Sequence, residues 1–270
     1  MSADLQLAAE AAFFAGEIIR QGYQGLHTIH SKGIGDFVSN IDERADEAAC
    51  QILKKDPLQF PILSEELSPE VHTDPNNLWI VDPLDGTSAF LFQTGPHFSS
   101  VLIARRQQGE NQLGVVYFPV TGEWFYAEKG QGAYQDGKPL KSDQQCSLNS
   151  GWVELNAYGD SSFETNVFAL LRKQLRTAKG AALVTQSAPY SGVAMRIADP
   201  QTQLVAAIHD NCQANVKQAA WDIAAPQCVL EEAGGVVMTL EGNPVDPFRA
   251  EPFLVAANPG VAESIRDLRD

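Results

Sequence analysis

The chain has 270 residues, 44% of them hydrophobic, so it can bury a sizeable core as one large domain or two small ones. With 34 acidic and 19 basic residues its formal net charge is −15, which argues against non-specific nucleic-acid binding because phosphate backbones select Lys- and Arg-rich surfaces. The four cysteines form no C-x-x-C pair, which argues against a zinc site or a disulfide framework.

The first residues predict a helix and no targeting segment. Asp4, Glu10 and Glu17 lie where a secretory leader would carry basic residues, and no apolar run reaches the roughly 20 residues needed to span a bilayer. We therefore expect a cytoplasmic protein. Residues 2–23 place apolar side chains three and four apart, which predicts an amphipathic helix packed on the core.

Acidic residues follow at two places before the central motif. A glycine-rich turn and a short extended piece lead to Asp42, which we expect to cap a helix over residues 43–55. A strand then ends in Glu65 and Glu66, a pair that is most often solvated when judged in isolation. A polar loop over residues 67–77 comes next.

The most informative stretch is residues 79–88, Trp-Ile-Val-Asp-Pro-Leu-Asp-Gly-Thr-Ser. Its apolar residues predict a short buried strand, which Pro83 should end because proline has no N–H for a ladder. Asp82 and Asp85 therefore fall where the strand breaks into a turn before a helix. Carboxylates bind Mg²⁺ and free N–H groups at a helix start bind phosphate, a combination that suits metal-assisted hydrolysis of a phosphate ester. The alternative is an acidic turn in which aspartate acts only as a cap.

The remaining chain predicts further mixed α and β structure. Four apolar or alternating runs over residues 98–135 indicate an antiparallel meander. The polar residues 137–150 mark a boundary between two subdomains, 1–145 and 146–270. The second subdomain is expected to contain strands at 151–156, 182–186, 235–240 and 252–256, and helices at 161–174, 190–208, 222–233 and from residue 261. Asp199-Pro200 should interrupt the second of these helices.

Two motifs resemble one known family. Asp-Pro-Leu-Asp-Gly-Thr at 82–87, and Trp221-Asp222-Ile-Ala-Ala leading to Glu232-Ala-Gly-Gly, are similar to the signatures of the inositol monophosphatase superfamily. That superfamily of Mg²⁺-dependent, Li⁺-sensitive phosphatases includes inositol monophosphatase, bisphosphate nucleotidase and fructose-1,6-bisphosphatase. The resemblance covers residues 5–265 and implies a mixed α/β (α+β) fold, the layered αβαβα sandwich, with a site between two subdomains.

The resemblance also implies a set of ligands for two or three Mg²⁺ ions. These are the carboxylates of Glu65, Asp82, Asp85 and Asp222, with the backbone carbonyl of Leu84 as a further hard ligand. Asp222 would reach the cluster from the second subdomain. Judged from its position alone, it favours the positive end of a helix, and the two roles are compatible.

Catalytic roles follow from the same resemblance. Residues 36–42 are similar to the family segment D-x-V-T-x-x-D with Ser39 in place of Thr, and we assign water activation to Asp36 and a structural role to Asp42. Asp36 and Thr87 would position the attacking water, and Glu66 would orient a ligand or water beside its neighbour.

Several residues are expected to contact substrate. The N–H groups of Gly86 and Thr87 would bind phosphate, and Gly192-Val193-Ala194 matches a family segment whose backbone contacts substrate. Arg196 is either a solvated helix arginine or a partner for a second phosphate. Asn215 stands where many inositol-phosphate hydrolases have a glutamate, and Phe92 departs from the usual polar or basic residue.

These expectations favour hydrolysis of a small phosphate monoester, of inositol- or sugar-phosphate type, by metal-activated water. The alternatives are a 3′(2′),5′-bisphosphate nucleotidase or fructose-1,6-bisphosphatase and, from another class, a non-catalytic interaction protein on the same scaffold. Catalysis is favoured because every acidic ligand position is filled. The expected partner is a small phosphorylated metabolite, without nucleic acid or membrane, and a homodimer is left open.

Overall fold

The computed structural model describes residues 1–23, 25, 28–33, 36–68, 74–95, 99–156, 169–179, 183–186, 189–209, 220–249 and 251–268. The chain forms two compact units. Unit 1 comprises Met1–Pro139, Pro189–Gly192 and Ala220–Val229, and unit 2 comprises Leu140–Ala188, Val193–Ala219 and Leu230–Asp270. The expected boundary was a single break at 145/146. The units instead separate before Leu140, and two later segments belong to unit 1 because they pack on its sheet.

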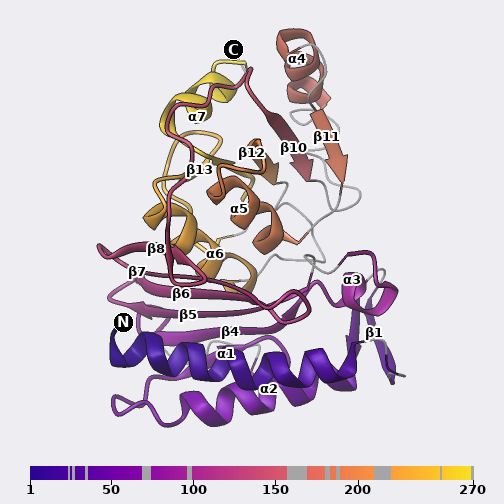
Figure 1. The fold of residues 1–270 in the computed structure, drawn as a ribbon, viewed down its shortest axis with the longest axis vertical. Coiled ribbons are helices and arrows are strands. Elements are labelled where there is room, and N and C mark those ends of the chain that lie inside the picture. Colours follow the sequence, from indigo (N-terminus) through magenta and orange to yellow (C-terminus); the bar gives the residue numbers. More distant parts are fainter. Residues whose placement is uncertain are drawn as a thin grey trace. The chain divides into compact units, whose positions relative to one another are not determined.

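Unit 1 is built on a seven-stranded sheet in the order β3-β4-β5-β6-β7-β8-β9 (Figure 1). Its strands are β3 (Ile62–Ser64), β4 (Leu78–Asp85), β5 (Ser100–Gln107), β6 (Glu110–Phe118), β7 (Glu123–Glu128), β8 (Gly132–Gln135) and β9 (Lys138–Leu140). β3 runs parallel to β4, β4 pairs antiparallel with β5, and β5 to β8 form the predicted antiparallel meander. All eight residues of β4 are buried, so its apolar run stabilises the centre of the unit.

Two long helices cover one face of this sheet. α1 (Ala3–Gly22) and α2 (Asn40–Leu53) lie side by side along it, and a two-stranded ribbon, β1 (Ile29–Gly33) and β2 (Asp36–Ser39), precedes α2 (Figure 1). The apolar stripe of α1 packs with that of α2 and with β4, β5 and β6 in one core cluster. The short helix α3 (Thr87–Phe92) follows β4 directly.

Unit 2 contains a five-stranded mixed sheet in the order β11-β10-β12-β14-β13. Its strands are β10 (Trp152–Asn156), β11 (Leu183–Gln186), β12 (Leu204–His209), β13 (Val236–Thr239) and β14 (Phe253–Ala256). α4 (Ala169–Lys179) and α7 (Pro259–Arg266) contribute buried leucine, valine and isoleucine side chains to its core. α5 (Tyr190–Ala198) and α6 (Ala220–Glu232) each begin in unit 1 and end in unit 2.

Three local expectations were wrong. The predicted helix 190–208 ends at Ala198, and residues 204–209 form strand β12, because their apolar run pairs with β10 and β14 at the centre of a sheet. β4 continues past Pro83. Its pairing with β5 shifts register between Asp82 and Asp85, so the N–H that proline lacks is not needed for a hydrogen bond to β5 at that point. Asp42 is not the residue that begins α2: Ser39 is the N-cap.

Across the described residues, no helix is both long enough and apolar enough to span a bilayer.

Candidate active site

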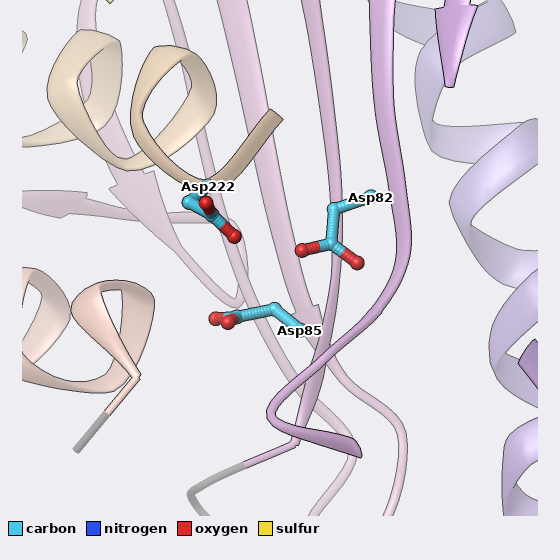
Figure 2. A group of neighbouring side chains, drawn as sticks. All are labelled: Asp82, Asp85 and Asp222. Atoms are coloured by element: carbon cyan, nitrogen blue, oxygen red, sulfur yellow. The ribbon is translucent and has the colours of Figure 1, made fainter. Parts of the chain in front are cut away.

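Three carboxylates meet at the end of β4. Asp82 and Asp85 come from this strand and Asp222 from the first turn of α6, and one oxygen of each lies within 4.8 Å of the others (Figure 2). We call Asp82, Asp85 and Asp222 the acidic cluster. All three belong to unit 1, so the expectation that Asp222 belongs to a second subdomain was wrong.

The first half of α6 belongs to unit 1 because it packs closely on β6. Gly114 of β6 lies so near the backbone of Ala225 that an added Cβ would overlap the Ala225 carbonyl oxygen. The side-chain amide of Asn111 donates a hydrogen bond of 3.2 Å to the carbonyl oxygen of Ala224. These contacts hold the turn that carries Asp222 against the sheet.

The local backbone explains the spacing of the two strand carboxylates. Asp82 Oδ1 accepts a hydrogen bond of 3.0 Å from the N–H of Leu84, a turn that wraps the chain around the Asp82 side chain. The register shift after Asp82 lets Asp85 face the same region. Gly86 then adopts φ 81°, a left-handed conformation that favours glycine, and α3 begins at Thr87.

The pKa values of two carboxyl groups in the acidic cluster are raised. Burial raises the pKa of Asp82 well above its usual range, and the neighbouring Glu65, Asp85 and Asp222 carboxylates raise it further. Burial raises the pKa of Asp85 to about 6, although hydrogen bonds from Ser191 and Ser100 oppose the shift. Burial therefore disfavours the ionised forms of Asp82 and Asp85, and neighbouring carboxylates add to this effect at Asp82.

Two serine hydroxyls hold the Asp85 carboxylate. Ser191, at the start of α5, donates a short hydrogen bond to Asp85 Oδ2, and Ser100 of β5 lies 3.4 Å from the same oxygen. The two hydroxyl oxygens are 2.9 Å apart, and both residues are buried. The sequence analysis did not identify either serine, because no local pattern connects them to Asp85.

Glu65 and Glu66 follow β3, as predicted, and both are half-buried. The N–H of Glu65 donates a hydrogen bond of 3.2 Å to the carbonyl oxygen of Val81, which places the Glu65 backbone beside the residue that precedes Asp82. The Glu65 charge acts on the pKa of Asp82, which lies on the neighbouring strand. Glu65 is not one of the three carboxylates that meet within 4.8 Å.

Thr87 contacts Asp42. The Thr87 hydroxyl lies 2.7 Å from Asp42 Oδ1 and 3.2 Å from the carbonyl oxygen of Leu84. The other oxygen of Asp42 accepts bonds from the N–H and hydroxyl of Ser39, which completes a capping box at the start of α2. Asp42 therefore contacts the predicted site residue Thr87 in addition to capping α2. Asp36 begins β2, but its side chain lies outside the described residues, and its predicted role stays a prediction.

The predicted substrate residues fall into both units. Gly192 belongs to unit 1, whereas Ala194 and Arg196 belong to unit 2. The Arg196 guanidinium lies 3.6 Å from the carboxylate of Glu154, a fully buried residue of β10. Asn215 lies outside the described residues. Phe92, at the end of α3, is 66% exposed.

Comparisons with known proteins identify the family of this chain. The model of the Inositol monophosphatase family matches residues 1–269. A relative named Nus factor SuhB, from Salmonella typhimurium, is 30% identical over 270 residues, which cover 98% of this chain and 96% of the relative. A relative named inositol-1-monophosphatase, from Bacillus subtilis, is 30% identical over 260 residues, which cover 93% and 90%.

A solved structure supports the same assignment. The extragenic suppressor protein suhB from Bartonella henselae aligns with a TM-score of 0.83 at 26% identity, covering 100% of this chain and 99% of that one. The expected mixed α/β fold class is confirmed. Because the family model spans almost every residue and relatives align over nearly their full length, this chain belongs to the inositol monophosphatase family.

Proposed function

We propose that this chain hydrolyses a small phosphate monoester, of inositol- or sugar-phosphate type, with Mg²⁺ held at the acidic cluster. The observation that carries the proposal is the convergence of three carboxylates within 4.8 Å at the end of β4. Membership of the family and the relative named inositol-1-monophosphatase support it.

The donor set fits Mg²⁺. Every atom that the acidic cluster offers is a carboxylate oxygen, the hard ligand that Mg²⁺ prefers. The raised pKa values of Asp82 and Asp85 support the proposal, because a bound cation would offset the cost of their negative charges. Glu65 and the carbonyl oxygen of Leu84 are the further ligands that we propose for two or three ions. That carbonyl oxygen lies 3.2 Å from the Thr87 hydroxyl, and a carbonyl oxygen has two lone pairs.

Bound Mg²⁺ would supply positive charge at the phosphate and lower the pKa of water. The chain itself must orient that water, and we assign this role to Thr87 with Asp42. The Thr87 hydroxyl has one proton, and the shorter contact, 2.7 Å to the Asp42 carboxylate, takes it. The lone pairs of the hydroxyl oxygen are then free to accept a hydrogen bond from water, and the proton that this water loses can pass through the hydroxyl to the Asp42 carboxylate. Asp42 thus joins Thr87 in this role, the role predicted for Asp36 stays a prediction, and we propose that Glu66 orients a ligand or water.

The contacts of Arg196 favour a monoester over a bisphosphate. Its positive charge already faces the buried Glu154 carboxylate, so a second phosphate would compete with an ion pair inside unit 2. We propose that one phosphate is bound by the N–H groups of Gly86 and Thr87, and the substrate contacts predicted for Gly192 and Ala194 stay predictions.

The test is Mg²⁺-dependent release of phosphate, followed as kcat/KM on inositol 1-phosphate, fructose 1,6-bisphosphate and 3′-phosphoadenosine 5′-phosphate. We expect the monoester to lead, with inhibition by Ca²⁺ and Li⁺ and little change in Arg196→Ala. Full activity in excess chelator would contradict the proposal. A bisphosphate lead of tenfold or more, about 1.4 kcal/mol of transition-state preference, that Arg196→Ala erases would favour the bisphosphatase alternative.

A second candidate is a non-catalytic role, which the name Nus factor SuhB of several relatives favours. In that case the chain would act by binding another macromolecule, and the expectation of no nucleic-acid partner would need its own test. The two candidates separate in a strain that lacks the protein. Rescue by a folded Asp85→Asn variant without phosphatase activity would support the non-catalytic role, and rescue by the wild type alone would support hydrolysis.

A further inference from the structure

Asp46, on α2, is a fully buried carboxylate outside the acidic cluster. Its Oδ2 atom accepts three hydrogen bonds: 2.8 Å from the Ser64 hydroxyl, 3.1 Å from the N–H of Glu66 and 2.9 Å from the N–H of Leu67. Its Oδ1 atom lies 3.2 Å from the thiol of Cys50. Asp46 therefore binds the turn that follows β3 at three points.

This turn carries Glu65. Residues 64–68 close on themselves, because Ser64 and Ser68 exchange two backbone hydrogen bonds of 3.1 and 3.3 Å. The peptide N–H of Glu65 is bound by Val81 of β4, and the next peptide N–H, that of Glu66, is bound by Asp46. Both peptide groups that flank the Cα of Glu65 are thus held, which fixes the direction in which the Glu65 side chain leaves the backbone.

We propose that Asp46 is a positioning residue: it holds the Glu65–Leu67 turn and thereby aims the Glu65 carboxylate at the acidic cluster. This inference rests on the proposed function and deepens it, because it names the residue on which one Mg²⁺ ligand depends. The hydrogen bond from the Glu65 N–H to Val81, the residue before Asp82, supports the placement of this turn beside the cluster. Residues that orient a ligand commonly change metal affinity when they are replaced.

The chain offers a matched control in Asp56. It too is a buried carboxylate of unit 1, and it accepts bonds from two backbone N–H groups, of Leu58 and Phe60, and from the indole of Trp79. Removing either carboxylate leaves buried donors unsatisfied and lowers stability. Only Asp46 holds the turn that carries Glu65, so a change in the response to Mg²⁺ separates positioning from a merely structural role.

The experiment titrates Mg²⁺ against the full-length wild type, Asp46→Ala, Asp46→Asn and Asp56→Ala. Two readouts are followed, the rise in melting temperature and the rate of phosphate release. We expect Asp46→Ala to raise the half-maximal Mg²⁺ concentration roughly tenfold or more in both readouts. Asp46→Asn keeps an acceptor oxygen toward the turn and should stay within about threefold of wild type. Asp56→Ala should melt earlier without a change in that concentration.

The possible results distinguish a failure of the positioning role from a failure of the proposed function. An unchanged Mg²⁺ midpoint in Asp46→Ala, or an equal shift in Asp56→Ala, overturns the inference while leaving the proposed function intact. A wild type that responds to Mg²⁺ in neither readout contradicts the proposed function and the inference together. If Asp46→Ala does not fold, Ser64→Ala removes one donor to Asp46, and a shift of about threefold in the same direction is then the supporting result, with no shift overturning it.

Discussion

Replacing Asp85 by asparagine should stabilise the metal-free protein while abolishing its activity. Asp85 is buried, and its pKa rises from the ordinary 3.8 to about 6. Between these two pH values the folded state binds the proton more tightly than the unfolded state, so stability falls as the pH rises through this window. The difference of about 2 units corresponds to about 3 kcal/mol of lost stability above pH 6.

Asp85→Asn removes this cost because an amide does not ionise. At pH 7.5 in chelator, we expect a gain of about 1–3 kcal/mol, which is roughly 2–8 °C in melting temperature for domains of this size. In Mg²⁺ the order should reverse, because a bound ion stabilises the wild type by its binding free energy. The assay is thermal unfolding with and without Mg²⁺, together with kcat for a phosphomonoester.

Asp56→Asn is the control, since it exchanges a buried carboxylate that is held by N–H donors and should lower the melting temperature in both conditions. If Asp85→Asn melts earlier than wild type in chelator, as the control should, the electrostatic reasoning is refuted. If it keeps more than roughly a tenth of wild-type kcat, far short of the loss expected for a metal ligand, Asp85 does not bind the catalytic metal.

Three further changes probe other parts of the molecule. Thr87→Val should lower kcat by about 10²-fold or more and leave the Mg²⁺-induced rise in melting temperature intact. Thr87→Ser should retain activity because it keeps the hydroxyl. Equal loss of activity in both variants would contradict the role of the hydroxyl. Gly114→Ala should lower the free energy of unfolding, measured in urea, by about 1–3 kcal/mol and weaken Mg²⁺ binding. The reason is that the added methyl group displaces the Ala225 backbone and the helix that carries Asp222. An unchanged unfolding midpoint would show that α6 can move without loss of stability. Burial lowers the pKa of His209 to about 3, so the folded state binds this proton less tightly than the unfolded state. His209 therefore leaves the free energy of unfolding unchanged above about pH 6.5 and lowers it as the pH falls from 6.5 toward 3. Relative to wild type, His209→Phe should therefore gain about 1.4 kcal/mol per pH unit below pH 6.5, and parallel unfolding curves against pH would contradict the burial of a neutral imidazole.

Most of the secondary structure follows from local patterns in the sequence. The spacing of alanine, leucine and isoleucine in residues 2–23 predicted α1, and alternating runs between turn residues predicted the meander from β5 to β8. These signals are local because a helix or hairpin buries residues close together in sequence. Residues 204–209 show the limit, since a short buried apolar run suits a helix and a central strand equally, and only pairing with β10 and β14 decided the outcome.

The acidic cluster was predictable in part for the same reason. Asp82 and Asp85 lie on one turn, so their proximity is a local fact, and the family motif added Asp222. The partners that orient the site are distant in sequence. The hydrogen bond from Thr87 to Asp42 joins residues 45 positions apart, and that from Ser191 to Asp85 joins residues 106 positions apart. No periodicity or turn signal encodes such a contact.

The sequence alone therefore determined the fold class, the family and the carboxylates of the central motif. The tertiary structure alone decided which distant polar groups contact the residues around the site: Asp42 contacts Thr87, Ser191 contacts Asp85, and Asp46 contacts the turn that carries Glu65. The physical reason is that a buried carboxylate must be hydrogen-bonded, but which donors satisfy it depends on how the strands and helices pack.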